Sequence, residues 1–126
     1  MMNILILRDF FSNLDWIVEF LSNLVKQEQI PCRVLLLNTY LVPKDTPLKK
    51  LVEKHDRLRK ISQSKLAQDK KIISSVVRSD LLQIETISNL GSLPSVISSM
   101  IKKEKISLIA MRKSNGIVYI QDIVEN

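Results

Sequence analysis

The sequence predicts an α/β, Rossmann-like fold: a parallel sheet of four strands with helices on both faces, followed by a C-terminal strand. Apolar runs alternate with helical patterns, as expected for parallel strands joined by helices. Only residues 112–116 separate the last two apolar runs, 106–111 and 117–120, whereas a parallel crossover needs about a dozen residues. Because Asn115-Gly116 suits a tight hairpin turn, the last strand is expected to pair antiparallel with its neighbour or to join a partner's sheet.

The first half of the chain predicts a strand, a helix and a second strand. Residues 3–7 and 33–39 are nearly continuous apolar runs, which are typical of strands covered on both faces. Between them, apolar residues recur at helical spacing over 14–25. Ser12, three residues before Asp15, resembles a helix N-cap, so we expect the helix to begin there.

A long, highly charged helix is predicted from Leu48 onward. Its apolar positions form one narrow stripe, which indicates that the helix leans on the sheet by a single edge. The stripe comprises Leu48, Leu51, Val52, His55, Leu58, Ile61 or Ser62, Lys65 and Leu66. His55, the only histidine, lies on this stripe and is expected to pack there. A metal site is not expected, because no second His or Cys stands near it at the spacing of metal ligands.

The second half of the chain predicts a further strand, helix and strand. Residues 82–88 alternate between apolar and polar, as in a half-exposed strand. A turn at 89–92 precedes Pro94, which suits the first turn of a helix because its missing N–H needs no partner there. The buried strand 106–111 follows. The carboxyl ends of all four strands meet at one edge of the sheet, where ligands bind in such folds.

Length and composition indicate a single domain spanning residues 1–126. The 45% of apolar and 25% of charged residues are ordinary for a folded, soluble protein. No apolar run approaches the roughly 20 residues that a membrane span needs, and the N-terminus lacks a basic leader. The single cysteine, Cys32, fits a reducing compartment and is expected to be buried. We therefore expect a cytoplasmic protein with no membrane partner.

The net charge of +6 comes from one segment of the chain. Residues 44–71 contain ten Lys or Arg residues and four acids, whereas the remaining nine basic and nine acidic residues balance. This excess suits an anionic partner. The alternative is a solvated helix face with pairs such as Glu53 and Arg57. No aromatic residue interleaves these charges, which disfavours single-stranded nucleic acid.

Four segments, taken in order, carry a family resemblance. Residues 4–12 run from an apolar strand into an Asp-Phe-Phe-Ser stretch that starts at Asp9. Val42-Pro43 follows the second strand, the segment 91–94 joins a Gly to a Pro after the third, and residues 107–111 form the fourth. Together these segments resemble the universal stress protein family over most of the chain.

The resemblance implies an adenine nucleotide alpha hydrolase-like fold, a role in stress response and a homodimer joined through the last strand. Many members bind ATP, with an Asp after the first strand at the adenine and a Gly-rich loop at the phosphates. By this resemblance Asp9, Thr39 and Met111 are candidate nucleotide-binding residues. The candidate dimer strand comprises Ile117, Val118, Tyr119 and Ile120.

Departures from the family pattern predict that the usual ATP site is lost. Arg112 and Asn115 stand where the family begins its phosphate loop with glycines, and the rest of that loop is absent. Glycine is needed there because backbone N–H groups approach the phosphates closely. Arg8, Arg112 and Lys113 are candidates to attract an anion as point charges, or else to fill a vestigial cleft.

We therefore expect a non-catalytic domain that acts through homodimerisation and an unknown protein partner, without a cofactor. The alternative is a sensor that binds an adenine nucleotide or a small anion through Asp9 and the nearby basic residues. No Ser-His-Asp set, carboxylate pair or metal cluster in the sequence points to catalysis. Binding of nucleic acid is not favoured.

Overall fold

Helices and strands alternate along the chain in the predicted order. The computed structural model describes residues 1–113 and 116–121. The elements are β1 (Met2–Leu7), α1 (Asp15–Glu28), β2 (Cys32–Tyr40), η1 (Leu48–Lys50), α2 (Leu51–Val76), β3 (Leu82–Leu90), α3 (Leu93–Glu104), β4 (Leu108–Lys113) and β5 (Gly116–Gln121). Each predicted strand and helix is present, with β3 extending two residues into the predicted turn at 89–92.

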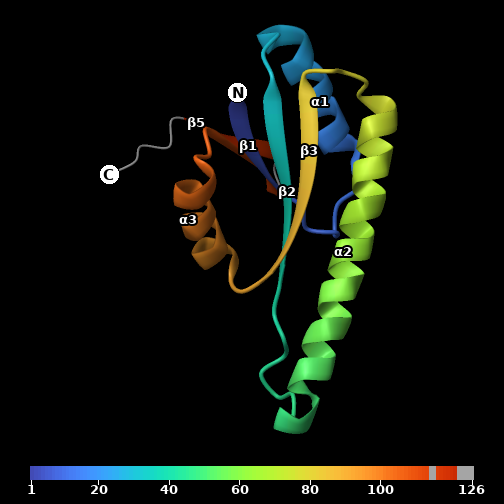
Figure 1. The fold of residues 1–126 in the computed structure, drawn as a ribbon, viewed down its shortest axis with the longest axis vertical. Coiled ribbons are helices and arrows are strands. Elements are labelled where there is room, and N and C mark those ends of the chain that lie inside the picture. Colours follow the sequence, from blue (N-terminus) through green and yellow to red (C-terminus); the bar gives the residue numbers. More distant parts are fainter. Residues whose placement is uncertain (114–115, 122–126) are drawn as a thin grey trace.

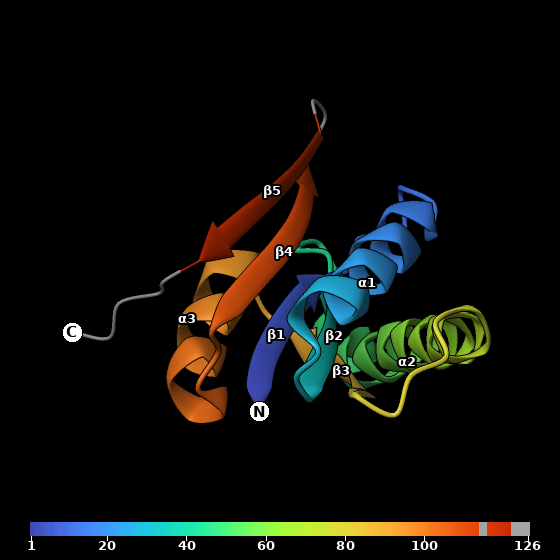
Figure 2. The ribbon, with the colours of Figure 1, turned by 90° about the horizontal axis from the view of Figure 1, so that it is seen from above.

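The strands form one five-stranded sheet in the order β3-β2-β1-β4-β5. β1 pairs in parallel with β2 and β4, β2 pairs in parallel with β3, and β5 pairs antiparallel with β4. The fold class is therefore confirmed, and the last strand pairs within the chain. The tight turn predicted between these two strands includes residues 114–115, which lie outside the described residues. Figures 1 and 2 show α1 and α2 on one face of the sheet and α3 on the other.

The core has two halves because side chains of a strand alternate between the two faces of the sheet. In β1, Ile4 and Ile6 pack with residues of α1 and α2, whereas Leu5 and Leu7 pack with residues of α3. All four are buried. This two-sided burial explains why β1 is a continuous apolar run rather than an alternating one.

The predicted start of α1 is wrong. The helix begins at Asp15, its N-cap position is Leu14, and no side chain caps it. Ser12 instead donates its backbone N–H and its hydroxyl to Asp9 Oδ1, both at 3.1 Å. The carboxylate of Asp9 thus organises a separate turn between β1 and α1, and this turn holds the hydroxyl that was expected to cap the helix.

The predicted apolar stripe of α2 holds only in its C-terminal half. The buried residues of α2 are Ser62, Leu66, Asp69 and Ile73. Leu48 and Val52, which were expected to pack, are 86% and 75% exposed. The physical reason is visible in Figure 1, where the N-terminal part of α2 runs past the end of the sheet.

Polar side chains attach α2 to the sheet at every seventh position. His55 Nε2 lies 2.8 Å from the Tyr40 hydroxyl of β2, and the two rings are also in contact. The Ser62 hydroxyl donates to Asn38 Oδ1 of β2 at 2.7 Å. Asp69 accepts a hydrogen bond from the side chain that follows β1, as described below. Since seven residues are about two helical turns, these three anchors share one face.

Arg33 joins the two parallel strands β2 and β3 to α3. Its Nη2 lies 3.1 Å from Glu85 Oε1 on β3, and its Nη1 lies 3.0 Å from Glu104 Oε2 at the end of α3. The hydrogen bonds from Arg33 lower the pKa of Glu85 below its ordinary value of 4.5. In the folded protein Glu85 therefore stays charged to lower pH than it does in the unfolded chain.

We predict that Glu85→Gln lowers the melting temperature modestly at neutral pH, because the ion pair with Arg33 is lost and the pair is partly exposed. The difference from the wild type should shrink as the pH falls below 4.5. A depressed pKa contributes stability above the unfolded value and loses it as the native carboxylate is protonated. Thermal unfolding of both proteins across a pH series measures this. The exposed Glu19→Gln is the control, and an equal difference at acidic and neutral pH would contradict the prediction.

Candidate functional site

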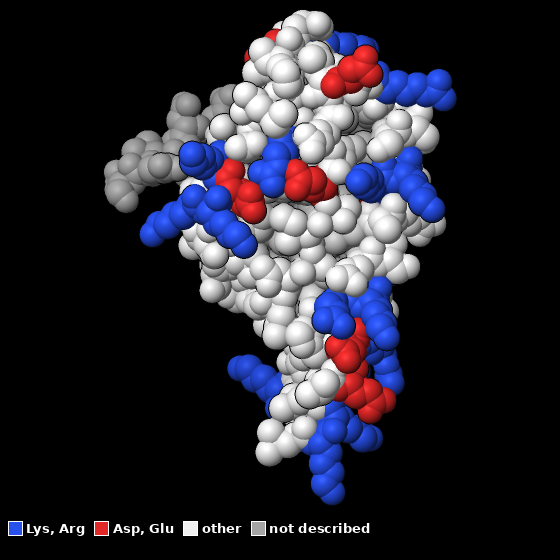
Figure 3. All heavy atoms as spheres, viewed as in Figure 1, with Lys and Arg blue, Asp and Glu red and all other residues white. Residues whose placement is uncertain are grey.

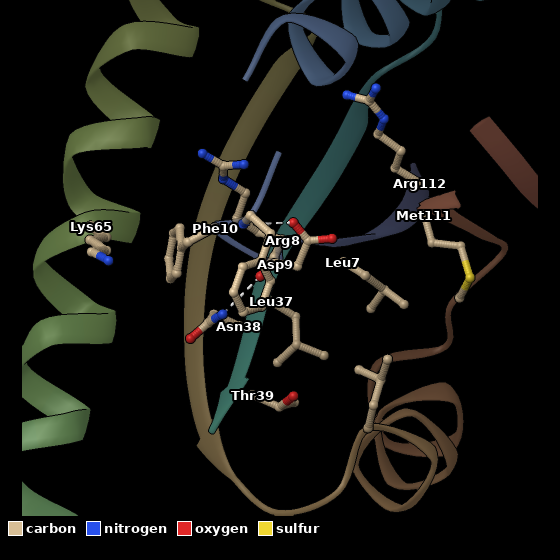
Figure 4. Close-up of a pocket in the computed structure, with 12 residues that line it drawn as sticks. Leu7, Arg8, Asp9, Phe10, Leu37, Asn38, Thr39, Lys65, Met111 and Arg112 are labelled. Carbon is tan, nitrogen blue, oxygen red and sulfur yellow. Dashed lines mark hydrogen bonds between the residues drawn. The ribbon is translucent and has the colours of Figure 1, made fainter. Parts of the chain in front are cut away.

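A cavity of about 550 Å³ lies at the carboxyl edge of the sheet. β1 lies between β2 and β4, so the chain order reverses beside β1, and ligands of parallel α/β sheets bind at such a point. The cavity is lined by Leu7, Arg8, Asp9, Phe10, Phe11, Leu37, Asn38, Thr39, Lys65, Leu93, Met111 and Arg112. Figure 4 shows these side chains from the ends of β1, β2 and β4 together with α2 and α3.

The fold brings together most of the residues that the sequence singled out. Arg8, Asp9, Thr39, Met111 and Arg112 all line the cavity. The side chains of Lys113 and of 117–120 lie outside the described residues, although their backbone belongs to β4 and β5. The convergence follows from topology, because parallel neighbours end at the same edge of the sheet.

The cavity combines apolar walls with a polar rim. Leu7 and Leu37 are buried core residues, and Met111 is half-buried beside them. On the rim, Asp9 Oδ1 is occupied by its own turn, since it also accepts the Phe11 backbone N–H at 3.1 Å. Asp9 Oδ2 makes no hydrogen bond within the described part of the chain. One carboxylate oxygen therefore remains to accept a hydrogen bond from a ligand.

Arg8 is held in a buried ion pair. Its Nε donates to Asp69 Oδ2 at 2.8 Å, and the two side chains are only 8% and 11% exposed. Its Nη1 donates to the Ser12 carbonyl at 2.7 Å, and its guanidinium lies 5.2 Å from the centre of the Phe10 ring. The guanidinium of Arg8 is thus bound to α2 and to the loop that follows β1. This geometry does not support the expected role of Arg8 as a free point charge for an anion.

Asn38 links the cavity wall to α2 and was missed by the sequence analysis. Its Nδ2 donates to the Arg8 carbonyl at 2.8 Å, and its Oδ1 accepts from Ser62. Ser88 of β3 donates to the Ser62 hydroxyl at 2.6 Å and extends the network to the edge strand. The signal in the sequence is a polar residue at the end of an otherwise apolar strand, which requires partners when it is half-buried.

Two basic residues remain on the rim. Lys65 of α2 places its Nζ 5.1 Å from the centre of the Phe10 ring. Arg112 is exposed, and Figure 4 shows its side chain extending away from Leu7 and Thr39. Lys65, Phe10, Phe11 and Leu93 were not predicted as site residues. The two adjacent Phe residues directly after β1 were the signal in the sequence for an apolar wall at this edge. Lys65 gave no such signal, because it lies on α2, far from the strand ends in the sequence.

The remaining chemistry of the described residues is limited. No group of His, Cys, Asp and Glu side chains among them is arranged to hold a metal ion. Cys32 is a buried free thiol, as expected, and burial raises its pKa, so the neutral thiol is favoured. Among the described helices, none combines the length and the hydrophobicity that crossing a membrane requires.

The likeness of this chain to known proteins lies in its fold and not in its sequence. The sequence matches no family model and no curated protein. The universal stress protein UspA from Lactobacillus plantarum superimposes with a TM-score of 0.66 at 16% identity, over 87% of this chain and 75% of that one. The fold is that of the universal stress proteins. A hypothetical protein, PH0823, shares it with a TM-score of 0.63 at 21% identity, over 87% of this chain and 74% of its own. The resemblance seen in the four segments is confirmed at the level of this universal stress protein fold.

We predict that Asp69→Ala lowers the free energy of unfolding by about 3 kcal/mol, because it leaves the Arg8 charge buried without a partner. Equilibrium unfolding in urea measures this. Asp80→Ala removes an exposed acid and is the control, with an effect within about 0.5 kcal/mol. The double variant Arg8→Met with Asp69→Leu should recover most of the loss, since an apolar pair replaces the ion pair. A loss for Asp69→Ala no larger than for the control would contradict the structural role of the pair.

Proposed function

We propose that the chain is a non-catalytic domain of the universal stress protein type that acts in the cytoplasm through homodimerisation and binding of a protein partner. The observation that carries this proposal is the position of β5 at the edge of the sheet, paired on one side with β4. An edge strand offers unpaired backbone N–H and C=O groups to another strand. The buried thiol of Cys32 is compatible with a reducing compartment.

The composition of the two edge strands favours β5 over β3 as the dimer edge. Residues 116–121 include no charged residue, and four of them, Ile117 to Ile120, are apolar. β3 carries Glu85, and α2 packs along this strand. Charged side chains on an edge strand are a usual means by which a sheet avoids pairing with another. Association through β5 is therefore the favoured mode.

We predict a dimer at micromolar concentration in size-exclusion chromatography with light scattering. Successive N–H groups of β5 point to opposite sides, so Val118→Pro and Tyr119→Pro each remove one donor, one facing β4 and the other facing outward. The variant that loses the outward donor should be monomeric by light scattering, and circular dichroism should show that it is folded. Thr86→Pro removes an outward-facing N–H from β3, the other edge of the sheet, at an exposed residue, and it should leave the dimer intact. A monomeric wild-type protein would overturn the proposal.

A second candidate function is binding of a small ligand in the cavity, favoured by its apolar walls and the open Oδ2 of Asp9. An adenine nucleotide would find a place for its base, but the charge of Arg8 is committed to Asp69. The glycine loop that holds phosphates in the family is absent from the sequence. Arg112 and Lys65 are then the rim cations left for a phosphate among the described residues.

We predict no heat of binding when the protein, freed of any co-purified ligand, is titrated with magnesium ATP at millimolar concentration. The phosphates of ATP lack the backbone donors that usually hold them. Isothermal titration calorimetry measures this. Binding of micromolar strength that is lost in Asp9→Asn would instead make the nucleotide sensor the leading function.

A further inference from the structure

The segment 41–60, here called the arm, projects beyond the sheet. It comprises the loop after β2, η1 and the N-terminal part of α2, and Figure 1 shows it extending past the ends of the strands. None of its residues is fully buried, whereas the buried residues of α2 begin at Ser62. The arm is therefore a helical element with few tertiary contacts of its own.

An apolar stripe on the arm has no cover from the described part of the chain. Leu48 and Val52 are 86% and 75% exposed, and Leu41 in the preceding loop is 64% exposed. Leu48 in η1 and Val52 in α2 are four residues apart, the spacing at which side chains along a helix lie beside each other. These exposed aliphatic side chains lie before the buried residues of α2, which begin at Ser62.

The arm is also strongly basic. Its seven basic residues are Lys44, Lys49, Lys50, Lys54, Arg57, Arg59 and Lys60. Its three acids are Asp45, Glu53 and Asp56, so its net charge is +4. Glu53 pairs with Arg57 and Asp56 with Arg59 on the helix itself. The five lysines make no ion pair within the described residues, and Figure 3 shows basic side chains gathered around the projection.

We propose that the arm is a docking surface for a segment of a partner protein that is rich in carboxylates and presents aliphatic residues at helical spacing. The aliphatic residues would cover Leu41, Leu48 and Val52, and the carboxylates would pair with the flanking lysines. Insertion of apolar residues of a helix against an apolar stripe, flanked by opposite charges, is a recurring mode of peptide recognition. This inference rests on the proposed partner-binding function and names its surface.

Other anionic surfaces fit the arm less well. Nucleic acid needs basic residues but has no use for an exposed aliphatic stripe, and the arm has no Phe, Trp or Tyr for stacking on bases. Interfacial membrane helices usually combine their basic face with Trp, Phe or Leu, and the arm has neither Trp nor Phe. A second arm would repel the first because both are positive.

The probe is a displayed library of short random peptides, selected on the full chain and counter-selected on Leu48→Ser with Val52→Ser. Both residues are so exposed that the variant is expected to fold as the wild type does, which circular dichroism checks. Selected peptides should be enriched in Asp and Glu and in aliphatic residues at i, i+3 and i+4. Their affinity should fall at least about tenfold in this variant and in Lys49→Gln with Lys50→Gln.

Matched controls are Ile72→Ser, an exposed aliphatic residue on the other half of α2, and Lys102→Gln with Lys103→Gln on α3. Both should leave peptide affinity unchanged. No enrichment, enrichment of basic peptides, or binding that ignores the arm variants would overturn the inference. So would tighter, arm-dependent binding to vesicles of phosphatidylserine and phosphatidylcholine or to duplex DNA. Light scattering of the arm variants tests dimerisation separately from peptide binding. The variants should remain dimers whether or not the arm binds peptides.

Discussion

The buried ion pair between Arg8 and Asp69 is the constraint on which the arrangement of the site depends. Arg8 follows a strand that is buried on both faces, and its side chain is only 8% exposed, so its charge requires a fixed partner. Asp69 supplies that partner from α2, sixty-one residues away in the chain. The pair fixes the end of β1 against α2, and the ring of Phe10 lies against the same guanidinium at the cavity. One side of the cavity thus owes its shape to an electrostatic contact between distant parts of the chain.

The polar attachment of α2 has a consequence for the whole surface of the protein. His55, Ser62 and Asp69 hold the helix to the sheet at intervals of two turns. Leu66 and Ile73, in the C-terminal half of α2, pack in the hydrophobic core. The contact of His55 with Tyr40, the last residue of β2, is the N-terminal one of these three, and α2 begins four residues before His55. Leu48 in η1 and Val52 in α2, both before His55, therefore stay exposed.

The three candidate surfaces lie in different places and do not obstruct one another. β5 forms one edge of the sheet, and β3, against which α2 packs, forms the other. A dimer joined through β5 would leave both arms at its outer ends. The cavity lies between these edges, at the carboxyl ends of β1, β2 and β4. Asn38 and Arg8 belong both to the cavity wall and to the α2 contact, so the site and the arm share one helix.

The sequence by itself determined the order and type of the elements, because periodicity of apolar residues reports how each element is buried. It also located Asp9, Thr39 and Met111 at the cavity, since the ends of parallel strands meet at one edge whatever their side chains. Only the tertiary structure decided which partners the polar residues take. The bond of Ser12 to Asp9 and the pairing of Arg8 with Asp69 depend on positions in space that residue spacing does not encode. For the same reason the sequence placed Leu48 on the narrow stripe that was expected to lean on the sheet: periodicity indicates which face of a helix is apolar, but the sheet decides how far along the helix that face is covered.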